Sequence, residues 1–168
     1  MPSDIDEDEQ KALIDDPLQL TKKLAFLKAK KIANDQKSHY DAVIIGSDQV
    51  SVLGKDILGK PYNLENAIKQ LMSMSGQKHQ LVTSVCVLYQ DKVFEWQDTT
   101  TLRMRELTSE QCRDYVTKDD PLMCAGSYKI ESLGITLFES IDTKDFTAIT
   151  GLPLISLTTV LKELKVLS

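Results

Sequence analysis

The sequence predicts an α/β protein with a mixed sheet and flanking helices. Segments with apolar residues at helical spacing alternate along the chain with short apolar segments of strand type, which is typical of a sheet covered by helices. Glycine-rich connections punctuate the second half. With 168 residues and 42% hydrophobic content, the chain fits a single domain, residues 1–168, with enough apolar material for a core.

The first half of the chain is expected to contain two helices and two strands. Residues 1–16 are acidic and poorly periodic, so we expect them to be exposed or disordered. A helix is predicted from Pro17 to about Gln36, because proline suits a first turn and leucines recur there at near-helical spacing. Asn63 is expected to cap a second helix that continues to about Met74. The predicted strands are 42–47 and 50–53.

The second half is expected to add three strands and two helices. Thr108-Ser109-Glu110-Gln111 forms a capping box, which predicts a short helix to about Val116. Pro153 begins a closing helix that carries leucines along one face. The predicted strands are Leu81–Leu88, Val93–Met104 and Ile135–Ile141.

The charge is unevenly distributed. Residues 1–16 hold seven acids, and the remaining 152 residues carry 19 bases and 18 acids. The absence of a basic stripe and an aromatic content of 6% argue against a nucleic-acid partner. The longest apolar runs are too short to span a bilayer, and the acidic beginning does not resemble a signal peptide. We therefore expect neither nucleic acid nor a membrane among the partners.

Cysteine and histidine residues give no pattern of a metal or disulfide framework. The three cysteines, Cys86, Cys112 and Cys124, are far apart and are expected to be reduced thiols of a cytoplasmic protein. His39 and His79 are isolated in the sequence, and we expect both at the surface or in turns.

Two short motifs indicate a phosphate ligand. Gly46-Ser47-Asp48-Gln49 is expected to form a turn at the C-terminal end of a buried strand, where open α/β sheets bind ligands. Gly59-Lys60-Pro61 follows shortly afterwards. A carboxylate can hold a divalent cation or accept a proton from water, and a lysine can neutralise phosphate. The pair suits a metal–triphosphate substrate, with Asp48 and Lys60 expected in a single cleft.

These motifs open a series of six that occur in order along the chain. The series resembles the Maf family of nucleoside triphosphate pyrophosphatases over about residues 2–164, and it looks most similar to the branch that acts on 7-methyl-GTP. The resemblance implies a fold shared with the inosine triphosphate pyrophosphatases, a divalent metal cation (Mg²⁺ or Mn²⁺), and cleavage to a monophosphate and pyrophosphate. The six motifs are Gly46-Ser47-Asp48-Gln49, Gly59-Lys60-Pro61, Ser75-Gly76-x-x-His79, Cys124-Ala125-Gly126-Ser127-Tyr128, Gly134-Ile135-Thr136-Leu137-Phe138-Glu139 and Thr150-Gly151-Leu152-Pro153-Leu154.

One part of the family pattern is not present in this sequence. Maf proteins begin with a strand and a Ser-x-Ser-x-x-Arg loop that binds phosphate, whereas this sequence opens on an acidic stretch. We therefore expect an N-terminally truncated form of the fold, either from an internal start or as a natural short form. Two alternatives stay open: a dTTP/UTP house-cleaning pyrophosphatase of the same family, and a catalytically impaired short form that binds nucleotide without turnover.

The resemblance assigns roles to four charged residues. Asp48 would be the proton acceptor, beside the metal-binding role that its carboxylate suggests, and Lys60 would be the catalytic lysine. Glu7 matches an acid of the metal site, while Lys28 matches a helix lysine that faces the phosphates. Because family members are often dimers, a homodimer is a further expectation.

Gln49 and Glu131 are the candidates for recognition of the base. Guanine presents two adjacent donors, N1–H and the N2 amine, which a single carboxylate accepts together, and methylation at N7 adds positive charge. Glu131 therefore favours a guanine-type base over a pyrimidine. Tyr128 lies on a predicted loop and is a candidate for stacking on the base, while Ser47 is expected to supply a hydrogen bond.

Overall fold

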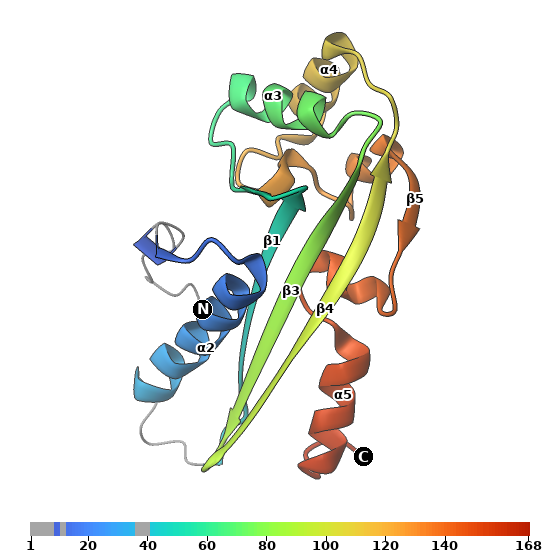
Figure 1. Cartoon of the computed structure of the whole chain (residues 1–168). Coiled ribbons are helices and arrows are strands. Elements are labelled where there is room, and N and C mark those ends of the chain that lie inside the picture. The colour runs from blue at the N-terminus through green and yellow to red at the C-terminus, as the bar shows by residue number, and fades with distance from the viewer. Residues whose placement is uncertain (1–8, 11–12, 36–40) are drawn as a thin grey trace. The chain divides into compact units, whose positions relative to one another are not determined.

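The structure is a computed structural model that describes residues 9–10, 13–35 and 41–168 (Figure 1). Most of residues 1–16, and His39, therefore lie outside the described residues. The strands are β1 (Ile44–Leu53), β2 (Asp56–Leu58), β3 (Lys78–Tyr89), β4 (Lys92–Met104) and β5 (Phe138–Asp142). The helices are α2 (Pro17–Asp35), α3 (Leu64–Met74), α4 (Ser109–Asp119) and α5 (Leu154–Glu163), with short 3₁₀ helices η1 (Ala125–Ser127), η2 (Leu133–Leu137) and η3 (Phe146–Thr150).

The predicted α/β class, a sheet flanked by helices, is confirmed. The five strands form one sheet in the order β2-β1-β3-β4-β5. β1 pairs antiparallel with β2, and β4 with β5, while β3 and β4 form a hairpin. Neighbouring strands alternate in direction in Figure 1, so the described sheet is antiparallel where we expected a mixed one. The connection through α3 explains this. It carries the chain from β2 at the edge to the other side of β1, so that β2 and β3 run in the same direction and both are antiparallel to the strand between them.

Two predicted strands have different bounds in the structure. The expected strands 42–47 and 50–53 are a single strand, β1, which continues through Gly46-Ser47-Asp48-Gln49 without a turn. The expected strand Ile135–Ile141 begins as η2 and becomes extended only at Phe138, where it pairs with Met104 of β4. In both cases contacts with distant segments decide the conformation.

Contacts divide the chain into two compact units. Unit one comprises Met1–Gln49, Val82–Asp98 and Asp145–Ser168, and unit two comprises Val50–Leu81 and Thr99–Lys144. Strands β1, β3 and β4 contribute to both units, and each unit is described by itself below.

Unit one buries apolar residues on both faces of β3. Ala25 and Ala29 of α2 pack against Cys86, whereas Leu157 of α5 packs against Val85 and Val87. Successive side chains of a strand point to opposite faces, so α2 and α5 cover opposite sides of this strand.

Unit two is organised by α3 and α4, whose predicted caps are both confirmed. Asn63 Oδ1 accepts a hydrogen bond from the Asn66 backbone N–H at 2.9 Å. Thr108 and Gln111 form the expected reciprocal capping box, with distances of 2.8 and 3.2 Å.

Within the described parts of the chain, no helix combines the length and apolar character needed to cross a bilayer.

His79 is a core residue, and the expectation of a surface or turn histidine is wrong. Its side chain on β3 is 2% exposed and its Nε2 lies 2.9 Å from the Tyr128 hydroxyl. Tyr128 and Phe138 complete an aromatic cluster around the ring, with centroids 5.6 and 5.8 Å from that of His79. Burial lowers the pKa of His79 from 6.5 to about 4, because the charged ring is poorly solvated there.

The buried His79 predicts an acid-sensitive fold. His79 binds a proton near pH 6.5 in the unfolded chain but only near pH 4 in the folded chain. The stability that depends on a neutral His79 is therefore fully present above pH 6.5 and is lost as the pH falls towards 4. We expect wild type to lose about 2–3 kcal/mol of unfolding free energy through this residue between pH 7.5 and 4.5. Urea unfolding of wild type and His79→Gln at both pH values measures it. Equal losses in the two proteins would contradict the assignment.

Candidate functional site

Asp48 lies in the middle of β1, on the face of the strand that meets α2. Gly46, two residues earlier on the same face, allows the helix to approach closely, since a Cβ there would lie 2.2 Å from the Ala25 carbonyl oxygen. Asp48 is a buried residue. The prediction of a turn at the end of the strand is therefore wrong. Asp48 lies within β1, and its carboxylate is held between this strand and helix α2.

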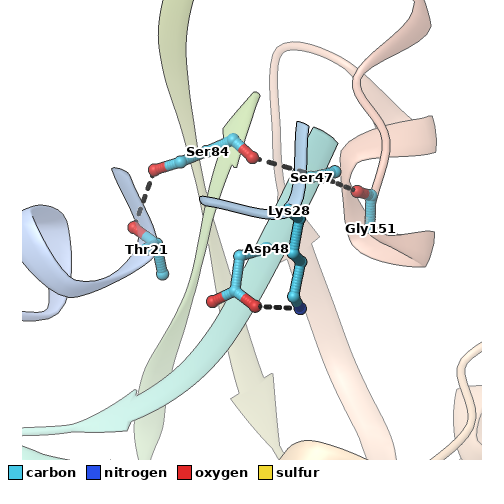
Figure 2. Close-up of polar contacts among 6 residues, drawn as sticks. All are labelled: Thr21, Lys28, Ser47, Asp48, Ser84 and Gly151. Carbon is cyan, nitrogen blue, oxygen red and sulfur yellow. Dashed lines mark hydrogen bonds and ion pairs between the residues drawn. The ribbon is translucent and has the colours of Figure 1, made fainter. Parts of the chain in front are cut away.

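Lys28 of α2 is the charged partner of Asp48. Its Nζ lies 2.7 Å from Asp48 Oδ1, and the side chains are 23% and 6% exposed (Figure 2). A carboxylate with so little access to water needs a nearby positive charge, and the partly exposed lysine provides one. The structure thus brings together two residues to which the family resemblance assigned phosphate and metal roles.

The side chains of Ser47 and Gln49 lie on the face of β1 opposite to that of Asp48. Ser47 Oγ donates to the carbonyl oxygens of Ser84 and Gly151, at 3.1 and 2.5 Å (Figure 2). Gln49 Nε2 donates to Thr83 Oγ1 and to the Ala148 carbonyl, both at 2.7 Å. The expected hydrogen-bonding role of Ser47 is thus directed at the protein itself.

The alternation of side chains separates Gln49 from Asp48. Adjacent residues of a strand face opposite ways, and the partners of the two side chains agree with this rule. The Gln49 amide group holds segment 148–151 against the strand. Its two hydrogen bonds, to Thr83 Oγ1 and the Ala148 carbonyl, lie on the face of the strand opposite to Asp48.

In unit two, Lys60 lies in the connection between β2 and α3. Both of its neighbours are fixed by α3: Gln70 Nε2 donates to the Gly59 carbonyl, and Asn66 Nδ2 donates to the Pro61 carbonyl, each at 3.1 Å. The lysine side chain itself is half-buried. Its backbone is therefore held firmly on both sides.

Gln70 is a residue that the sequence reasoning missed. Its Nε2 binds the Gly59 carbonyl, and its Oε1 accepts a hydrogen bond of 2.5 Å from Ser127 Oγ. One amide therefore links the segment that carries Lys60 to the segment that carries Cys124 and Tyr128. The sequence offers no signal for this role, because it depends on contacts with Gly59 and Ser127 that only the fold creates.

The charges of four side chains act on Cys124, and two of these side chains belong to predicted site residues. The pKa of the Cys124 thiol is raised, first by burial, while the charges of Lys129 and Lys60 lower it and those of Glu131 and Asp119 raise it. Lys60 and Glu131 are far apart in the sequence, yet both lie within electrostatic reach of this thiol. The Glu131 side chain is exposed.

Tyr128 lies in the core of unit two. The ring is 5% exposed, packs against Phe138 with centroids 4.9 Å apart, and contacts His79. Such a ring leaves no open face for a base, so Tyr128 is not included in the proposal below. Glu7, the predicted second metal ligand, lies outside the described residues.

The fold is of the α/β class; unit one holds a buried carboxylate with an adjacent lysine, and unit two holds a fixed Gly-Lys-Pro segment. Comparison with known proteins makes this specific. The Maf-like protein family model matches residues 1–164, and the chain belongs to the Maf family.

Relatives with named activities extend the comparison. The chain is 44% identical over 159 residues to the 7-methyl-GTP pyrophosphatase of Bdellovibrio bacteriovorus, which covers 95% of this chain and 82% of that protein. It is 41% identical to the 7-methyl-GTP pyrophosphatase of Pseudomonas putida, over 94% and 82% of the two chains. It is also 34% identical to the dTTP/UTP pyrophosphatase of Aquifex aeolicus, over 95% and 82%.

Proposed function

We propose that this protein is a nucleoside triphosphate pyrophosphatase that hydrolyses 7-methyl-GTP to 7-methyl-GMP and pyrophosphate. The observation that carries the proposal is the similarity, over 95% of the chain, to a relative named for this activity. The exposed Glu131 supports it, since a carboxylate matches the two donors of a guanine and the positive charge of its methylated form.

In the proposed reaction, water attacks the α-phosphorus and the bond from that phosphorus to the bridging oxygen breaks. Asp48 accepts the proton of the attacking water, and the electron pair of the broken bond leaves with pyrophosphate. Lys28, already 2.7 Å from the carboxylate, orients Asp48. In unit two, Lys60 neutralises negative charge on phosphate oxygens.

A divalent cation is part of the proposal, because the family implies one. In the described residues no three His, Cys, Asp or Glu side chains form a metal-binding group. Mg²⁺ and Mn²⁺ can be bound through one or two carboxylates together with substrate phosphates. Asp48 is the described residue that would hold the ion. When bound, such an ion offsets the charge of the phosphate oxygens.

The second candidate is a dTTP/UTP pyrophosphatase, which the Aquifex relative favours. Glu131 argues against it, because a pyrimidine offers one N3–H between two carbonyls, a poor match for a carboxylate. We further propose a cytoplasmic location, supported by three free thiols, and a homodimer, as is frequent in the family.

Glu131→Gln tests the choice of base. We expect the ratio of kcat/KM for 7-methyl-GTP to that for UTP to fall about 10-fold or more, because the amide cannot accept both guanine donors and carries no charge. Pyrophosphate release with 7-methyl-GTP, GTP, dTTP and UTP measures the ranking. Glu163→Gln, an exposed glutamate of α5, is the matched control. An unchanged ranking in Glu131→Gln would remove Glu131 from recognition of the base.

A further inference from the structure

A buried carboxylate at the end of α4 holds the turn that carries Glu131. Asp119 is the last residue of that helix and is 8% exposed. Its Oδ1 accepts a hydrogen bond of 2.5 Å from Ser132 Oγ, and its backbone carbonyl accepts one of 2.7 Å from Lys129 Nζ. The helix end is thus bound to the chain on both sides of Glu131.

The turn is also closed on itself. The backbone N–H groups of Ser132 and Gly134 donate to the Lys129 carbonyl, at 3.2 and 2.9 Å. The Tyr115 hydroxyl accepts from the Lys129 backbone N–H at 3.0 Å. A Cβ at Gly134 would lie 2.2 Å from the Lys129 oxygen, so only glycine allows this closure. Residues 129–134 form a tight, anchored turn.

Asp119 is suited to this role because it stays ionised. Burial alone would raise the pKa of its carboxyl, but hydrogen bonds from Ser132, Tyr115 and the Leu133 backbone, with the charge of Lys129, lower it below its usual value. Charge-assisted hydrogen bonds are stronger and shorter than neutral ones. The turn is therefore held by a permanent negative charge, while the Glu131 side chain points into solvent.

We propose that Asp119 is a positioning residue for base selectivity: through Ser132 and Lys129 it fixes the turn that presents the Glu131 carboxylate to the base. The inference rests on the proposed function and adds to it a residue that never touches the substrate. A carboxylate on a loose turn would still bind cations and bases, but it would not meet the two donors of a guanine at one defined place.

The test compares substrate selectivity with stability. We expect Asp119→Ala to reduce the kcat/KM ratio of 7-methyl-GTP to UTP at least 5-fold, and Asp119→Asn, whose amide oxygen still accepts from Ser132 but carries no charge, to reduce it by a smaller factor. Added to Glu131→Gln, Asp119→Ala should reduce the ratio no further. Asp114→Ala, an exposed aspartate of the same helix paired with Lys118, is the control and should leave the ratio unchanged.

The outcomes separate this inference from the function on which it rests. If Glu131→Gln changes the ratio and Asp119→Ala lowers activity on every nucleotide equally, Asp119 is merely structural and the inference is overturned. If Glu131→Gln leaves the ratio unchanged, the assignment of base recognition fails first. If Asp119→Ala does not fold, Ser132→Ala decides: a ratio reduced at least 3-fold supports the inference, and an unchanged ratio overturns it.

Discussion

Asp48→Asn is expected to lower pyrophosphate release from 7-methyl-GTP by at least about 100-fold while the chain remains folded. The amide has nearly the same shape as the carboxylate, but it cannot accept the proton of the attacking water, and a general base typically contributes about 10²–10⁴ in rate. The substitution would also weaken the binding of a divalent cation at this position, because the ligand loses its negative charge.

Stability must be followed beside activity in this variant. Replacing Asp48 removes the partner of Lys28, but that lysine is 23% exposed and can turn towards water, so we expect only a modest fall in melting temperature. Asp56→Asn, at an exposed position of β2, serves as the control. A folded Asp48→Asn protein that kept most of its activity would exclude Asp48 from the mechanism.

Gly46→Val is expected to unfold the chain or nearly so. The first carbon of any side chain would lie 2.2 Å from the Ala25 carbonyl oxygen and 2.7 Å from the Ala29 backbone nitrogen. These are backbone atoms of a helix, so they cannot move aside individually, and α2 would have to leave β1. Overpacking of this kind costs about 3 kcal/mol or more, a large part of a margin of roughly 5–15 kcal/mol.

Thermal unfolding followed by circular dichroism measures the effect. Gly59→Ala is the matched control, because nothing lies within 4 Å of a Cβ at that position and its backbone needs no glycine. A Gly46→Val protein that melted within a few degrees of wild type would show that the close approach of α2 to β1 is wrong.

The helices could be predicted because their signals are local. Pro17 begins α2, and Asn63 and Thr108 cap α3 and α4 as their side-chain chemistry requires. β1 was divided in two because Gly46-Ser47-Asp48-Gln49 has the composition of a turn. The glycine serves helix packing, and Ser47 and Gln49 bind segment 148–151, about a hundred residues away, which no local pattern reveals.

The site was predictable to a similar extent. Family motifs identified Asp48 and Lys28, and the structure brings these two together. Recognising the unbroken strand would have placed Gln49 on the other face. The burial of Tyr128 depends on His79 and Phe138, and the supporting role of Gln70 depends on a contact with Ser127. Long-range packing decides all of these.

Analysis of the products formed by the wild-type protein tests the central claim most directly. With 7-methyl-GTP and Mg²⁺ or Mn²⁺, we expect 7-methyl-GMP and pyrophosphate in equal amounts, at a higher kcat/KM than for dTTP or UTP. Formation of a diphosphate and orthophosphate would contradict the proposed cleavage. Faster turnover of the pyrimidine nucleotides would contradict the proposed substrate.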